Sequence, residues 1–184
     1  TMKLIKVKVQ KFKRIASAEL ELADLNILVG GNGSGKSSIL QAIHLACCVT
    51  RQAERVDRTG STVGVDELDY LPTEHYATLG HNANWGNWQS DSAASGLDLT
   101  FLNDAGVAST AAVTLRSARN AGISIRGNLP SALSGLLRTK TRFFSAYIPG
   151  ISGIPNSEEK RSEKVILKAC SFGDSNIFLR NVLL

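Results

Sequence analysis

Residues 25–38 read LNILVGGNGSGKSS, and this stretch decides the fold. Residues 25–29 form a short, mostly apolar run, as expected of a strand that is covered on both faces. Residues 30–38 are rich in glycine and serine. A helical pattern follows at once, with apolar residues at three- and four-residue spacing from Ile39 to about Arg51 or Ala53. The order strand, glycine-rich loop, helix predicts an α/β fold.

The loop matches G-x-x-x-x-G-K-[ST] at every fixed position. Because the glycines of the loop have no side chains, successive backbone N–H groups can surround a phosphate. The N-terminus of the following helix adds the positive end of its dipole. The lysine then places an ammonium between the β- and γ-phosphates, and the serine hydroxyl coordinates magnesium. The predicted ligands are ATP and Mg²⁺, with Lys36 as the catalytic residue and Ser37 at the metal. The predicted phosphate-binding residues are Gly30, Gly31, Asn32, Gly33, Ser34, Gly35, Lys36, Ser37 and Ser38.

Two further strands are expected before this loop. Ile5, Val7 and Val9 alternate with polar residues, which is the period of a strand with one buried face. Phe12 breaks this register, so a bulge or bend is expected there. Residues 17–22 form a second alternating run that returns toward the loop.

Residues 9–43, VQKFKRIASAELELADLNILVGGNGSGKSSILQAI, resemble the opening of ABC-type ATPase heads of the SMC, RecF, RecN and OLD-nuclease branch. The loop has the N-G-[SA]-G-K-[ST] form of ABC-type ATPases; Gly31 departs from the family, which more often has proline or a larger residue. In that branch a strand ends in phenylalanine and basic residues. The resemblance therefore implies that Lys13 and Arg14 lie close to the nucleotide phosphates. The alternative is a solvated strand edge, which lysines commonly protect.

The rest of the chain predicts one domain, residues 1–184, with an irregular insert over residues 56–96 and a short helix near residues 66–70. An antiparallel β-meander over residues 97–126 is expected to follow. The expected later elements are a strand over residues 142–148, a helix that begins at Ser157, and another from Asp174 or Ser175 to Leu184. The fold class is thus a P-loop NTPase, the first lobe of an ABC-type head beside a β-meander.

The resemblance also implies motifs that this chain lacks in recognisable form. Gln52 and Gln89 are available as the magnesium-sensing glutamine, but neither follows a convincing strand. Residues 133–135 begin like an LSGGQ signature and continue as an apolar stripe. Asp66 and Glu67 form an Asp-Glu pair, for which a loop-to-helix cap is the better interpretation.

In SMC-like heads the missing motifs lie in a C-terminal lobe. We therefore expect this chain to be the first lobe of a longer ATPase. The chain alone would bind ATP but hydrolyse it slowly. Two ATP-bound heads would form a homodimer. With its C-terminal lobe or effector domain, the protein would act on DNA in repair or phage defence. Two alternatives stay open. One is a small kinase with a lid arginine at position 116, 119 or 138, and the other is a non-hydrolysing ATP-dependent dimerisation module.

The composition of the chain limits the classes of protein to which it can belong. The chain has 184 residues, 43% of them hydrophobic, and a formal net charge of +5, which permits a polyanionic partner without requiring one. Its longest apolar run is far too short to cross a membrane, and secretion is not expected, because no charged-then-apolar segment with a cleavage site is recognised. Cys47, Cys48 and Cys170 lack zinc-like spacing and indicate reduced thiols of a cytoplasmic protein. Trp85 and Trp88 either contact a partner or pin the insert to the core.

Overall fold

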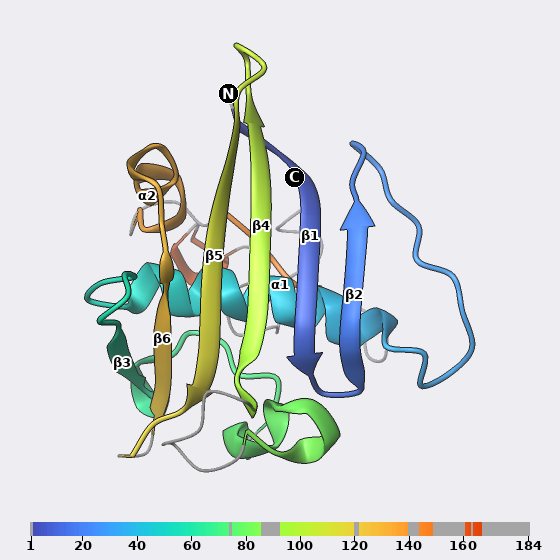
Figure 1. Cartoon of the computed structure of the whole chain (residues 1–184), viewed down its shortest axis with the longest axis vertical. Helices are drawn as coiled ribbons and strands as arrows, with labels where there is room; N and C mark the ends of the chain where they lie inside the picture. The colour runs from blue at the N-terminus through green and yellow to red at the C-terminus, as the bar shows by residue number, and fades with distance from the viewer. Residues whose placement is uncertain are drawn as a thin grey trace.

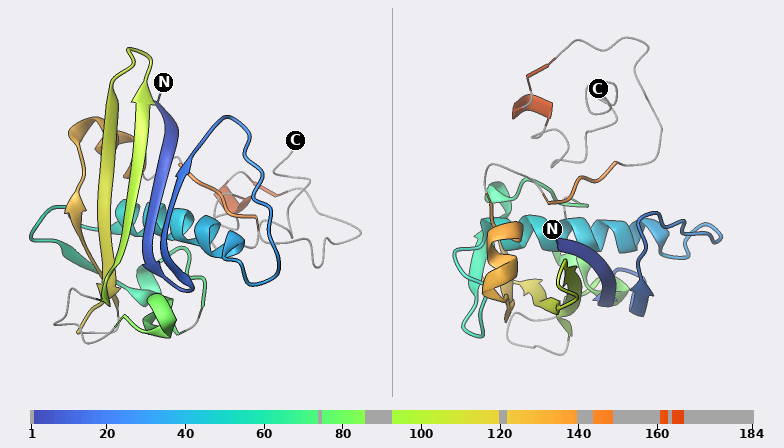
Figure 2. Two further views of the ribbon diagram at one scale, coloured as in Figure 1. Left: turned by 45° about the vertical axis from the view of Figure 1, so that its right-hand side comes forward. Right: turned by 90° about the horizontal axis from the view of Figure 1, so that it is seen from above.

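The computed structural model describes residues 2–73, 75–85, 93–119, 122–139, 144–148, 161–162 and 164–166, and the structural statements below concern these residues. A six-stranded antiparallel sheet forms the centre of the molecule, and a long helix crosses one of its faces (Figures 1 and 2). The strands are β1 (Met2–Phe12), β2 (Ile15–Glu21), β3 (Ser61–Gly64), β4 (Ser95–Asn103), β5 (Ala108–Ser117) and β6 (Gly122–Asn128). The helices are α1 (Lys36–Gln52) and α2 (Ser131–Leu137).

The strands lie in the order β2-β1-β4-β5-β6-β3. β1 is an inner strand: Val7 lies opposite Leu20 of β2 on one side and Leu99 of β4 on the other. β4, β5 and β6 are consecutive antiparallel neighbours, which confirms the predicted meander. The predicted α/β class is confirmed as well, because α1 packs on this sheet.

The core lies between the sheet and α1. Val7 and Val9 of β1 are fully buried, as the alternation in the sequence predicts, and Lys6 and Lys8 take the other face. β4 repeats this pattern: Leu97, Leu99 and Phe101 point into the core. From α1, the fully buried residues include Leu45, Ala46 and Val49. Each fully buried valine, leucine or phenylalanine side chain contributes about 1.5–3 kcal/mol to folding.

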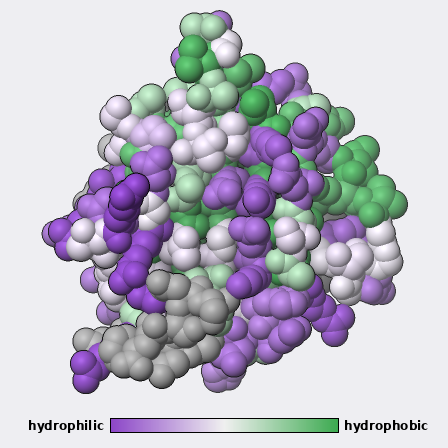
Figure 3. Space-filling model, in the orientation of Figure 1, coloured by the Kyte–Doolittle hydropathy of each residue, from purple (hydrophilic) through white to green (hydrophobic). Residues whose placement is uncertain are grey.

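Residues 25–29 differ from the prediction, because they form no strand. Leu25, Ile27 and Val29 are 78–89% exposed on an extended loop between β2 and α1. This loop appears at the right of Figure 1, and Figure 3 shows hydrophobic side chains at the same edge. An apolar run forms a buried strand only where it can pair with a free sheet edge and where another layer of the fold covers it. β2 lies at one edge of the sheet, but residues 25–29 pair with no strand, and no described element covers them.

The described residues between α1 and β4 include β3 and the short 3₁₀ helices η1 (Val65–Glu67), η2 (Tyr76–Leu79) and η3 (His81–Ala83). β3 joins the sheet edge beside β6, whereas η2 and η3 lie next to the turn between β1 and β2 (Figure 1). The expected short helix near residues 66–70 is therefore one 3₁₀ turn that begins at Val65.

In the described part of the second half, α2 is a helix that the sequence analysis did not predict, and one expected strand is absent. Residues 144–148 of the expected strand over residues 142–148 carry no strand structure. The starts of the helices expected at Ser157 and at Asp174 or Ser175 lie outside the described residues. In the part of the chain that the structure describes, no helix is long and apolar enough to span a membrane.

Candidate functional site

The glycine-rich loop leads directly into α1, whose first helical residue is Lys36. Gly33 and Gly35 have φ values of 80° and 95°, in the left-handed region that favours glycine. The Lys36 ammonium folds back over the loop and donates hydrogen bonds to the Gly30 carbonyl at 2.7 Å and the Gly31 carbonyl at 2.8 Å. Its Nζ also lies 3.3 Å from the Ser34 hydroxyl. A cation from the helix thus fastens the loop at its centre.

The start of α1 presents backbone donors to the same loop. The first intrahelical bond runs from the Ile39 amide to the Gly35 carbonyl at 2.9 Å, so the amides of Lys36, Ser37 and Ser38 precede the helical ladder. No acidic residue occupies the first turn of α1. The positive end of the helix dipole therefore faces the loop without a local counter-charge.

The loop residues suit a phosphate group. A Cβ at Gly30 would come within 2.8 Å of the Ser34 hydroxyl oxygen, so a side chain there would displace that hydroxyl. Asn32 and Ser37 are exposed, whereas Ser38 is half-buried. A short loop of main-chain donors, one lysine and hydroxyl groups is the donor set that a nucleotide polyphosphate with a hard divalent cation requires.

Lys13 and Arg14, for which the resemblance implies a place close to the nucleotide phosphates, form the turn between β1 and β2. The Arg14 guanidinium lies over the loop, because a Cβ at Gly33 would be 3.1 Å from its Nη1 atom. Lys13 instead donates from Nζ to the Gln41 side-chain oxygen at 2.7 Å, and burial lowers the pKa of its ammonium. The sequence analysis missed Gln41, which lies one turn after Ser37 on the same side of α1.

The motif candidates outside the loop lie elsewhere. Gln52 ends α1, sixteen residues beyond Lys36, which corresponds to about 24 Å along the axis. Its side-chain oxygen accepts a hydrogen bond from the Asp69 amide, so it is no sensor for this loop. Glu67 accepts a hydrogen bond from the Gly64 amide at 3.2 Å, as the cap interpretation predicts. Residues 133–135 lie within α2, and Gln89 is outside the described residues.

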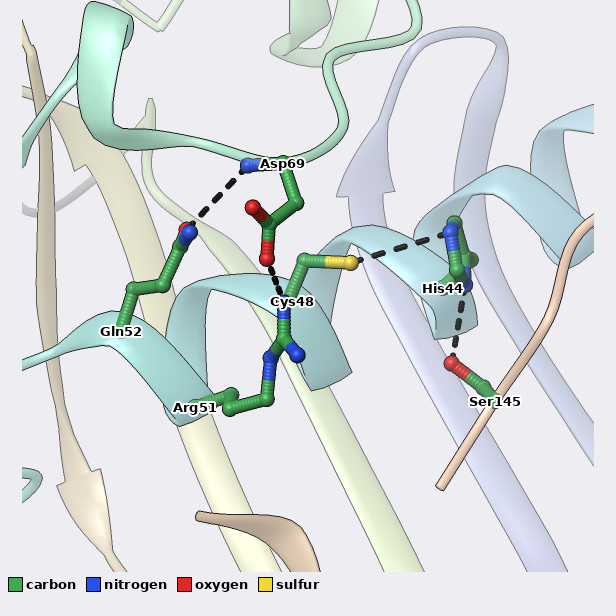
Figure 4. A network of polar contacts seen from close by, with 6 residues as sticks. All are labelled: His44, Cys48, Arg51, Gln52, Asp69 and Ser145. Carbon is green, nitrogen blue, oxygen red and sulfur yellow. Dashed lines mark hydrogen bonds and ion pairs between the residues drawn. The ribbon is translucent and has the colours of Figure 1, made fainter. Parts of the chain in front are cut away.

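A buried polar network occupies the other half of α1 (Figure 4). His44 places Nδ1 2.8 Å from the Ser145 hydroxyl oxygen and Nε2 3.7 Å from the Cys48 sulfur. One turn further, Arg51 forms an ion pair with Asp69. Burial raises the pKa of the Cys48 thiol to about 12 and that of the Cys47 thiol to about 11. Both thiols are therefore protonated at neutral pH, and the network holds residues 144–148 and the segment around Asp69 against α1.

Trp85 is 1% exposed and donates from Nε1 to the Ser95 hydroxyl at 2.7 Å. The sequence analysis left two roles open for the tryptophans, a partner contact or an anchor for the insert. Trp85 anchors the segment between α1 and β4 to the core. Trp88 lies outside the described residues.

Comparisons with known proteins match this same part of the chain. Residues 2–51 match the AAA ATPase domain family. The curated relatives include the DNA replication and repair protein RecF of Shewanella loihica, 54% identical over 43 residues, and RecF of Photorhabdus laumondii, 50% identical over 44 residues. Each match covers 23% of this chain and 12% of the relative.

Fold, loop and matches agree on the class: residues 2–51 have the sequence and the glycine-rich loop of a P-loop ATPase domain. Within that class, the chain is similar to RecF proteins over a segment of 43 or 44 residues. The predicted resemblance is thereby confirmed for the N-terminal lobe.

Proposed function

We propose that this chain binds ATP with Mg²⁺ at residues 30–38. The observation that carries the proposal is the loop itself, a glycine-rich turn that Lys36 fastens at the positive end of α1. A nucleotide that replaces the Gly30 and Gly31 carbonyls as the partner of the Lys36 ammonium gains a charge-assisted hydrogen bond in a tight main-chain cradle.

The roles of the individual residues follow from their chemistry. The backbone amides of Gly31, Asn32, Gly33, Ser34 and Gly35, with those that begin α1, would hold the phosphates. Lys36 would neutralise the β- and γ-phosphates, and Ser37 would contribute its hydroxyl to Mg²⁺. Arg14 adds a second cation beside Gly33. Bound Mg²⁺ would supply charge neutralisation between the phosphates.

For the whole protein we propose an ATPase that acts on DNA in repair, in the cytoplasm. The support is the similarity to the start of RecF and, weakly, the positive net charge. Turnover would require a C-terminal lobe with the signature and Asp-Glu motifs, and ATP-bound heads would pair as a homodimer. An OLD-like role in phage defence is the finer alternative, and an effector domain with nuclease chemistry would support it.

The kinase alternative has less support. A lid arginine must be mobile, but Arg138 donates from Nη2 to the carbonyls of Ala53 and Glu54, each at 2.7 Å. This arginine therefore ties α2 to the end of α1.

Titration of the purified chain with labelled ATP and Mg²⁺ tests the proposal. We expect saturable binding that Lys36→Ala weakens at least about tenfold, since a charge-assisted hydrogen bond contributes about 1.5–3 kcal/mol. Lys3→Ala is the matched control, because Lys3 is an exposed lysine whose ion pair with Asp24 contributes little. No saturable binding by folded protein, or equal binding by Lys36→Ala, would contradict the proposal.

A further inference from the structure

The turn that carries Arg14 has an unusual backbone. Lys11 and Lys13 have φ values of 52° and 51°, although neither is glycine. Residues with side chains adopt this conformation at a cost of about 1–3 kcal/mol each and keep it only where the surroundings impose it. The bend that the sequence indicates around Phe12 thus falls between two strained residues. Such strain concentrates at functional sites.

The surroundings that impose this conformation on Lys13 come from a segment far along the chain. The Lys13 amide donates to the Leu79 carbonyl at 2.8 Å. The Lys13 carbonyl accepts from the Asn82 amide at 3.1 Å and from Nδ1 of His81 at 3.0 Å. Because a carbonyl oxygen can only accept, His81 carries a proton on Nδ1. Residues 79–82 therefore hold both backbone polar groups of one strained residue.

A second anchor holds Lys11. Its carbonyl accepts a hydrogen bond from the Ser95 hydroxyl at 2.6 Å, and that hydroxyl accepts one from Trp85 Nε1 at 2.7 Å. Ser95 and Trp85 are buried, so water does not compete for these bonds. Gly80 pairs with Phe12 between the two anchors, where a Cβ would lie 2.3 Å from the Asn84 carbonyl oxygen. We name residues 76–85 the clamp segment.

We propose that the clamp segment is a positioning element of the nucleotide site, in which His81 fixes the Lys13 backbone so that Arg14 stays over Gly33 as a phosphate contact. The clamp segment and the glycine-rich loop over residues 30–38 both contact this turn, and Arg14 immediately follows the residue that His81 holds. A preorganised guanidinium loses less conformational freedom on binding than a free one. This inference rests on the proposed function, because it assumes that residues 30–38 bind ATP.

A clamp that only stabilises the fold would weaken binding by the same factor whether or not Arg14 is present. A clamp that acts through Arg14 has no further effect once that guanidinium is gone. A double-mutant cycle between His81 and Arg14, with ATP affinity as the readout, separates these two roles.

The cycle measures binding of labelled ATP with Mg²⁺ to the 184-residue chain and to three variants: Arg14→Ala, His81→Phe and the double variant. We expect Arg14→Ala to weaken binding about tenfold and His81→Phe three- to tenfold. In the Arg14→Ala background, His81→Phe should change affinity less than about twofold. His81→Gln keeps an N–H donor and should restore most of the affinity. His75→Ala, at an exposed histidine of the same loop, is the matched control.

Each outcome of the double-mutant cycle either supports or overturns the inference. An unchanged affinity of His81→Phe, or an equal loss with and without Arg14, overturns the inference even if the variant melts at a lower temperature. If His81→Phe fails to fold, His81→Ala takes its place in the cycle. Absence of Lys36-dependent ATP binding in the wild type overturns the proposed function and this inference together. Wild-type binding without coupling between His81 and Arg14 overturns this inference alone.

Discussion

At the scale of single residues, two glycines of the loop over residues 30–38 differ: the backbone conformation requires glycine at Gly35 but not at Gly31. Gly35 has φ 95°, and a Cβ there meets only ordinary contact with Ile15 at 3.5 Å. Gly31 has no atom within 4 Å of its ideal Cβ position and no left-handed φ. Loop function thus requires glycine at position 35 for conformational reasons, and at position 31 only if a ligand approaches closely.

The first prediction compares these two positions. Gly35→Ala should lower the free energy of unfolding by about 1–2 kcal/mol, because alanine resists φ values in this region. Gly31→Ala should leave it within about 0.5 kcal/mol. Urea unfolding, followed by circular dichroism, measures both. Equal destabilisation by the two substitutions would contradict the loop conformation described above.

The second prediction concerns the buried thiols. Burial raises the pKa values of Cys47 and Cys48 above the ordinary value near 9.0, to about 11 and about 12. Folding therefore favours the protonated thiols, and this stability is complete below about pH 9 and falls as the pH rises toward 11–12. Iodoacetamide at pH 8 should label both residues only after unfolding. Peptide mapping checks this, and rapid labelling of Cys48 in folded protein would show that the thiol is accessible.

At the scale of elements, periodicity predicted what depends on local sequence. The alternation of Val7 and Val9, the meander and the helix after the loop all follow from side-chain spacing, and the structure has them. The prediction of a strand over residues 25–29 was wrong for a physical reason. Their apolar composition is typical of a buried strand, but burial depends on neighbours elsewhere in the chain. Spacing also could not reveal His81 or Gln41 beside the turn, because long-range folding brings them there.

The third prediction follows from that failure. Val29 is 89% exposed and Val9 is fully buried, so the same substitution tests both environments. Val9→Ala should cost about 2 kcal/mol or more, from lost transfer free energy and a residual cavity. Val29→Ala should cost less than about 0.5 kcal/mol in this chain. Urea unfolding midpoints measure the difference. A large loss from Val29→Ala would indicate that residues 25–29 are covered after all.

At the scale of the whole molecule, the sheet and α1 position the glycine-rich loop over residues 30–38 but leave it open to solvent. Residues 31–34 are exposed, and the sequence offers no convincing water-polarising glutamate. ATP hydrolysis needs a positioned water and a site from which bulk water is excluded. Binding and turnover should therefore separate in this chain.

The fourth prediction states that separation. The purified chain should bind ATP in a Lys36-dependent manner yet hydrolyse it well below about one turnover per second, the lower end of ordinary enzyme rates. A phosphate-release assay with Lys36→Ala as the blank measures this rate. Several Lys36-dependent turnovers per second would mean that the described lobe is catalytically sufficient. Gel filtration with and without ATP would show whether the nucleotide joins two copies.

The uncovered loop over residues 25–29 also has a practical consequence. Leu-Asn-Ile-Leu-Val has high β-propensity, no charge and no proline, which is the composition of segments that stack into cross-β aggregates. Storage at high concentration would favour intermolecular stacking of this segment, so dilute samples suit the solution work. A charged residue in place of Ile27 is the simplest way to a preparation that can be concentrated.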